Sequence, residues 1–161
     1  MTSGSGSWSF TEADGRAITG ALEEFLQSSG AHSALLVDRA GQLVATAGAP
    51  LQVDLTAFAT LTAADFSASD QLARLLGEPG CRALVHQGET GTMFLTDVAQ
   101  RVILVARFDD RTTLGLVRLT AKGAVGTLTR LFHAVFTRAT STTPQPGLLA
   151  GADDEIDRLF G

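Results

Sequence analysis

The stretch DLTAFATLTAADFSASDQLARLLG, residues 54–77, decides the fold of this chain. Asp54 is a favourable residue for a helix N-cap, and Gly77 followed by Pro79 ends a helix. Between them, apolar and small residues recur at steps of three and four, which places them on one face of a helix. We expect this face to pack on the rest of the domain; its residues are Leu55, Phe58, Ala59, Thr62, Phe66, Ser69, Ala73 and Leu76.

The rest of this helix surface carries few charged side chains. A second apolar row consists of Leu61, Ala68, Leu72 and Leu75. The remaining stripe is small and weakly polar, with a single charge, and consists of Thr60, Ala63, Ser67, Gln71 and Arg74. An ordinary solvated face would carry several Lys and Glu residues. We therefore interpret this helix as the one that meets other proteins, through Ala63, Ser67, Gln71 and Arg74; an Ala-rich core helix is the alternative.

Composition limits the class of protein. The chain has 161 residues, a net charge of −5 and no basic cluster, which argues against nucleic acid as a partner. No run approaches eighteen apolar residues, so no membrane span is expected, and the N-terminus lacks the pattern of a signal peptide. The single cysteine, Cys81, suits a reducing compartment. We expect one cytoplasmic domain.

The other segments predict two more helices and five strands. Thr11 and Asp14 resemble a capping box that opens a first helix, which ends at Gly30. Helical spacing from Leu114 predicts a long last helix to about Arg138, with Thr112 or Thr113 as its N-cap, although its first residues alone could form a strand. Short runs rich in apolar residues predict strands at Ser33–Asp38, Leu43–Gly48, Ala83–Gln87, Thr92–Val98 and Val102–Phe108.

These elements define a mixed α/β (α+β) domain in the order α-β-β-α-β-β-β-α. The last three strands are joined by short turns, so they must be antiparallel neighbours. We expect residues 1–9 to be a flexible N-terminus, residues 10–139 the domain and residues 140–150 a linker. Residues 151–161 combine acids with an apolar patch of Ile156, Leu159 and Phe160. This segment is expected to bind a partner; a frayed tail is the alternative.

The sequence shows no constellation for catalysis, cofactor or metal binding. There is no phosphate-binding loop, and His32, His86 and His133 are scattered without ligand spacing. Cys81 and His86 are five residues apart, so strand alternation would place them on opposite faces. Adjacent Asp109 and Asp110 are typical of a turn. We therefore expect no catalytic, cofactor-binding or metal-binding residues.

Several stretches together resemble the MglB-type family, bacterial Roadblock-domain proteins of polarity and gliding that partner the Ras-like GTPase MglA. They are LLVDRAGQLVATAG (35–48), FATLTAADF (58–66), LARLLGE (72–78), HQGE (86–89), FDDRTTLGLVRL (108–119) and DDEIDRLF (153–160). The similarity spans about residues 10–141 and returns at residues 153–160. Residues 64–71 depart from the family pattern, because they are bulkier and more polar than the Gly/Ala-rich run expected there.

The resemblance implies a Roadblock/longin/profilin-like fold, a five-stranded antiparallel sheet in strand order 2-1-5-4-3 with helices on both faces. It also implies a homodimer in which third strands pair edge to edge and middle helices lie side by side. A bare edge strand does need a cover or a mate. The interface residues would be Leu61, Ala68, Leu72, Leu75, Leu84, Val85 and His86.

The resemblance further implies a function. The dimer would bind the GTP-bound form of an MglA-like Ras-family small GTPase and stimulate hydrolysis by repositioning the GTPase's own catalytic residues, in control of cell polarity or gliding motility. Concentration at a cell pole is implied too. A Roadblock scaffold that binds a GTPase without accelerating hydrolysis is the alternative, and an enzyme in its own right is the third and weakest hypothesis.

Overall fold

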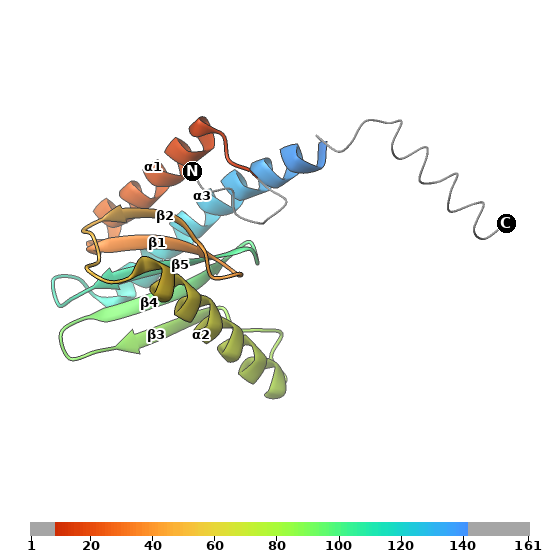
Figure 1. The fold of residues 1–161 in the computed structure, drawn as a ribbon. Coiled ribbons are helices and arrows are strands. Elements are labelled where there is room, and N and C mark those ends of the chain that lie inside the picture. The colour runs from red at the N-terminus through yellow and green to blue at the C-terminus, as the bar shows by residue number, and fades with distance from the viewer. Residues whose placement is uncertain (1–8, 142–161) are drawn as a thin grey trace.

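The computed structural model describes residues 9–141 and has the predicted order of elements (Figure 1). The elements are α1 (Glu12–Ser29), β1 (Ser33–Asp38), β2 (Leu43–Gly48), α2 (Leu55–Leu75), β3 (Ala83–Gln87), β4 (Thr92–Val98), β5 (Val102–Phe108) and α3 (Leu114–Ser141). All five strands have the predicted bounds. The predicted α+β class is confirmed.

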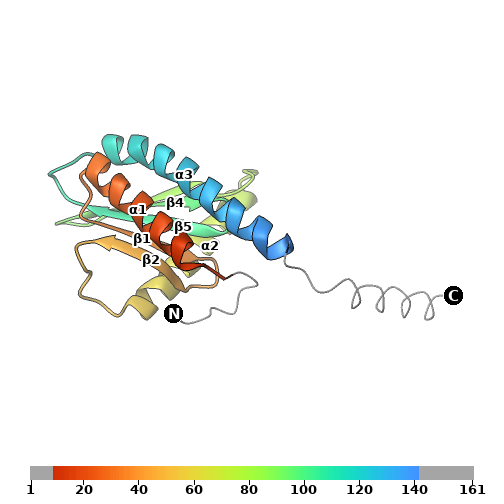
Figure 2. The same ribbon diagram turned by 90° about the horizontal axis from the view of Figure 1, so that it is seen from above.

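The strands form one antiparallel sheet in the order β2-β1-β5-β4-β3, as predicted. The nearly continuous apolar strand β5 lies at its centre, between β1 and β4. Helices α1 and α3 lie side by side on one face, and α2 lies on the other (Figure 2). The sheet therefore has two edges, β2 and β3. It forms the middle of three layers, between α1 and α3 on one face and α2 on the other.

Alternation along the strands divides the core into two parts. Leu104 and Ala106 of β5 face α1 and α3, where Leu22 and Phe132 are buried with them. Ile103 and Val105 point the other way and pack with Phe66 of α2. The larger core lies under α1 and α3, so these two helices are firmly fixed and α2 is supported by fewer side chains.

The helix ends follow the predicted chemistry. The Thr11 hydroxyl accepts a hydrogen bond from the Asp14 amide, and the Asp14 carboxylate accepts one from the Thr11 amide, which completes the capping box of α1. Of the two candidates for the N-cap of α3, Thr113 accepts a hydrogen bond from the Leu116 amide, whereas Thr112 donates to the Ser29 carbonyl. Helix α3 continues to Ser141, beyond the predicted end and into the predicted linker.

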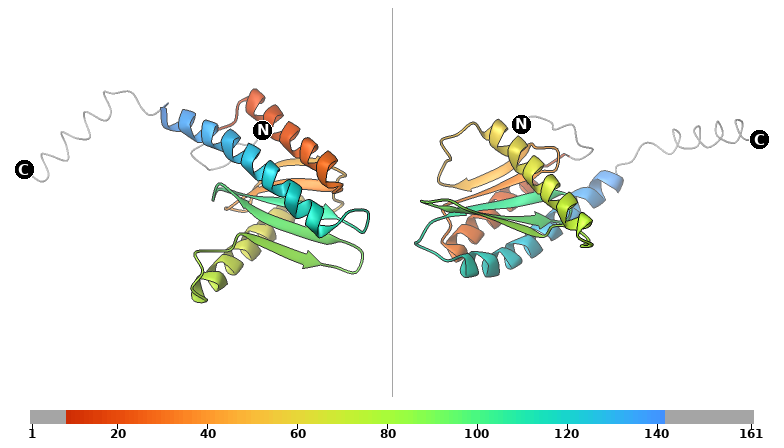
Figure 3. Two further views of the ribbon diagram at one scale, coloured as in Figure 1. Left: turned by 180° about the vertical axis from the view of Figure 1, so that it is seen from behind. Right: turned by 90° about the horizontal axis from the view of Figure 1, so that it is seen from below.

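Two predictions about the buried face of α2 are wrong. Ala63, expected on the exposed stripe, is only 8% exposed, because the β1–β2 turn approaches α2 closely at Gly41 and closes over this side of the helix. Leu76, expected to be buried, is 83% exposed. Helix α2 crosses the sheet diagonally, and its C-terminal end projects past the sheet at β3, so its last turn has no sheet beneath it (Figures 1 and 3).

Other predictions fall outside the described residues, among them the partner-binding segment with Ile156, Leu159 and Phe160 and most of the N-terminus and linker. Within residues 9–141, none of the helices is long and apolar enough to cross a membrane.

Candidate partner-binding surface

The outer side of α2 carries a row of exposed leucines. Leu61, Leu72 and Leu75 are 69%, 61% and 82% exposed, and Ala68 lies exposed in the same row. These are the residues predicted as the second apolar row. Exposed apolar rows of this kind mark surfaces that bind another protein. The structure thus leaves an apolar surface of the predicted composition uncovered.

Next to this row lies the polar stripe. Ser67 and Gln71 are exposed, and the Gln71 side-chain amide donates to the Ser67 hydroxyl at 3.4 Å, one turn apart. Arg74 pairs with Asp70 at 3.2 Å, so its guanidinium is already partly neutralised. Ala63 is not part of the exposed stripe. What remains of the predicted stripe is a nearly neutral surface of Thr60, Ser67, Gln71 and Arg74. We call its C-terminal part, Ser67, Gln71 and Arg74, the α2 stripe.

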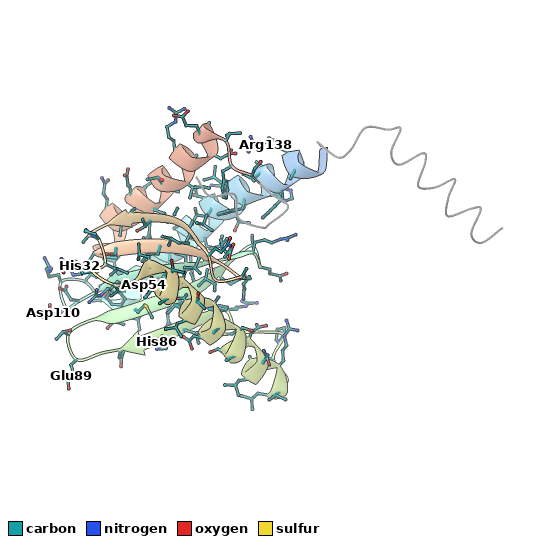
Figure 4. The ribbon with its side chains drawn as sticks, viewed as in Figure 1. His32, Asp54, His86, Glu89, Asp110 and Arg138 are labelled. Atoms are coloured by element: carbon teal, nitrogen blue, oxygen red, sulfur yellow. The ribbon has the colours of Figure 1, made fainter. Side chains whose placement is uncertain are left out.

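Two polar links join the second half of α2 to β3 and to the loop that precedes it. The Asp65 carboxylate contacts Nε2 of His86 in β3 at 2.6 Å, and the Asp70 carboxylate accepts a hydrogen bond from the Cys81 amide at 2.8 Å. Figure 4 shows His86 close beside α2. These links connect α2 to β3 where α2 leaves the sheet. The leucine row and the edge strand are therefore held as one surface.

The β3 edge has a backbone that pairs only with β4 among the described strands. Leu84 packs toward α2, and Val85 packs toward α1 and α3. The outer edge of such a strand is a template for another strand. Leu84 and His86 lie on the face of the sheet that α2 covers, whereas Val85 lies on the opposite face; the role of all three in a dimer interface stays a prediction.

Cys81 and His86 lie on the same side of the sheet among the described residues. Cys81 precedes β3, so strand alternation does not extend to it, and it packs on the α2 side of the sheet, where His86 also points. The prediction that these two side chains face opposite ways is wrong. Burial raises the pKa of the Cys81 thiol, which disfavours a thiolate nucleophile. No group of metal-ligating side chains exists within residues 9–141.

A cluster that the sequence did not predict lies at the loop between β5 and α3. The Asp109 carboxylate contacts Nε2 of His32 at 2.8 Å and the Arg111 guanidinium at 3.2 Å. Hydrogen bonds from the Arg111 backbone and side chain, and then from His32, hold the pKa of Asp109 well below its usual range. His32 and Asp109 are far apart in sequence, so no spacing signal could have linked them. The cluster fixes the loop that leads into α3.

Residues 19–108 match the family model of the Roadblock/LC7 domain, more than half of the chain. The chain belongs to the Roadblock/LC7 domain family.

Within this family the chain is similar to MglB proteins. It is 38% identical to Myxococcus xanthus MglB, covering 73% of this chain and 95% of that one, with a TM-score of 0.70. It is 36% identical to the gliding protein MglB from Thermus thermophilus, covering 78% and 95%, with a TM-score of 0.72. An MglB with a tetrameric arrangement is 35% identical, covering 80% and 97%, with a TM-score of 0.75.

Proposed function

We propose that this protein is a homodimeric GTPase-activating regulator of an MglA-type, Ras-like small GTPase in the cytoplasm, acting in cell polarity or gliding. The observation that carries the proposal is the α2 surface: an exposed leucine row beside a nearly neutral stripe, on a chain that shares 35–38% identity with MglB proteins. The leucine row and the β3 edge form the dimer interface, and the α2 stripe binds the GTPase.

The dimer arrangement follows from what is left uncovered. Pairing two β3 edges would satisfy the backbone groups of both strands and extend the sheet across the two-fold axis. The same operation would bring the two α2 helices together, covering Leu61, Leu72 and Leu75. The exposed fractions of these three side chains add up to about two fully exposed leucines per subunit. Burying them therefore contributes on the order of 8 kcal/mol per dimer.

Activation in this proposal uses no inserted arginine. Arg74 pairs with Asp70, and Arg111 pairs with Asp109, so each of these guanidinium groups is held by a carboxylate of its own chain. A smooth, weakly charged surface can instead bind one conformation of the switch loops better than the other. If that conformation aligns the GTPase's own catalytic groups, the population shift alone accelerates hydrolysis.

A passive Roadblock scaffold is the second candidate, because a small, nearly neutral stripe also fits a partner that is bound and not activated. Single-turnover phosphate release by the MglA-type GTPase of the same organism, with and without this protein, separates the two. Activation predicts at least about a tenfold rise in rate, which corresponds to about 1.4 kcal/mol of transition-state stabilisation. Binding with an unchanged rate would establish the scaffold and refute activation.

A further inference from the structure

Helix α3 has an unusual charge distribution. Its 28 residues include Arg118, Lys122, Arg130 and Arg138 but no Asp or Glu. Arg138 is paired with Asp14 of α1. Arg118 and Lys122 are exposed, and within residues 9–141 neither forms an ion pair. The helix is therefore a positive element in a chain of net charge −5.

Two of the exposed positive charges of α3, Arg118 and Lys122, lie along one flank of the helix. Lys122 follows Arg118 by four residues, and Thr129 and His133 follow Lys122 by seven and eleven, so the four share one side of the helix. The guanidinium of Arg118 lies over the ring of Phe94 in β4, which places this flank on the side away from α1. An acidic ligand on this flank would meet no carboxylate of α3.

A groove of about 630 Å³ lies on this flank, between α3 and the β4–β5 turn; it is lined by Ala99, Gln100, Arg101, Thr129, His133, Phe136 and Thr137. The Arg101 guanidinium lies 4.7 Å from the ring centre of Phe136. Ala99 and Gln100 adopt left-handed φ angles of 56° and 58°, which glycine or asparagine would adopt at lower cost. The turn thus holds side chains, and not bare glycine, against the groove.

We propose that the acidic and apolar C-terminal segment of this same chain, residues 153–160, docks in this groove. Its acids are Asp153, Asp154, Glu155 and Asp157, and its apolar residues are Ile156, Leu159 and Phe160. The acids would form ion pairs with Arg101, Lys122 and Arg118. The apolar residues would pack on Ala99 and Phe136, which line the groove. The segment is also within reach. The twelve residues from Ser141 to Asp153 span up to about 40 Å, whereas Lys122 lies about 28 Å back along α3.

The docking is expected to be weak and reversible. Exposed ion pairs contribute little each, so the isolated segment should bind with millimolar affinity. A short linker supplies an effective concentration of about 1 mM, which keeps such a segment docked about half of the time. A partner that binds the same residues would then compete with the groove. Docking itself does not depend on the proposed GTPase, so its test is independent of the test of the proposed function.

Paramagnetic broadening in the full-length chain tests this. In a Cys81→Ser background, Gly151→Cys carries a nitroxide label, and broadening is measured at the amides of Thr129 and His133. The amides of Glu23 and Glu24, two exposed residues of α1, are the internal control. Docking predicts broadening at α3 at least threefold stronger than at α1. Equal broadening at both sites would overturn the proposal.

Charge exchange gives the decisive variants. Asp153→Lys with Asp154→Lys should reduce the broadening at Thr129 and His133 at least threefold, and adding Arg101→Glu with Lys122→Glu should restore it. The matched control Arg16→Glu, an exposed arginine of α1, should change nothing. Broadening insensitive to these exchanges would contradict the proposal. So would equal broadening when label and isotope are on separate chains, because the occupant would then be a second copy.

Discussion

The leucine row of α2 makes the dimer testable through one substitution, Leu72→Glu. Leu72 is 61% exposed in the single chain, so the substitution removes no core contact there. A fully buried leucine contributes about 1.5–3 kcal/mol, so covering Leu72 is worth about 1–2 kcal/mol per subunit, and about twice that per dimer. The added carboxylates would be buried unpaired, at a further cost of several kcal/mol. The dimer dissociation constant should rise at least about a hundredfold.

Light scattering between 1 and 100 µM measures the effect. The wild type should have about twice the chain mass of 16.8 kDa, and the variant should approach the mass of one chain while keeping its helical circular dichroism. Leu119→Glu is the matched control, since Leu119 is 65% exposed on α3, on the opposite face of the sheet. A Leu72→Glu variant that dimerises as tightly as the wild type would refute the proposed seam.

Two further predictions concern stability. The pKa of Asp109 is lowered in the folded state, so Asp109 stabilises the fold above about pH 4, and this stabilisation is lost as the pH falls toward the folded pKa. Asp109→Asn should therefore make the stability less dependent on pH in this acid range, as followed by circular dichroism. An unchanged acid transition would contradict the role of His32 and Arg111. Deleting residues 148–161 should change GTPase binding but lower the melting temperature by no more than about two degrees, since a segment docked half of the time stabilises the fold only slightly. A much larger fall in melting temperature, measured by calorimetry, would show that the segment is part of the folded structure.

The sequence predicted the sheet well because its strands are short, apolar and separated by clear turns. Val102–Phe108 lies at the centre of the sheet as its continuous apolar run indicates. The long helix α3 was predicted despite Gly123 and Gly126, since its buried row of Val117 to Phe132 has strict helical spacing. A periodic pattern over several turns outweighs the cost of single glycines.

The candidate surface was predicted less completely, because helical spacing does not show where a helix leaves its sheet. Ala63 is buried by the β1–β2 turn, and Leu76 is exposed beyond the sheet edge. The polar links from Asp65 and Asp70 to the β3 region join distant positions and leave no local signal. The basic flank of α3 did have a signal, the absence of acids between Leu114 and Ser141, and the prediction overlooked it.

The central claim is that the α2 stripe contacts the GTP-bound GTPase. Its most direct test is a binding titration of the GTPase, loaded with a non-hydrolysable GTP analogue, against the wild type and Ser67→Arg with Gln71→Arg. Both residues are exposed, so the variant should stay folded and dimeric, and Arg16→Glu serves as the control. Two long cations on a surface that must be covered should weaken binding at least about a hundredfold. A folded, dimeric variant that binds as tightly as the wild type would contradict the account.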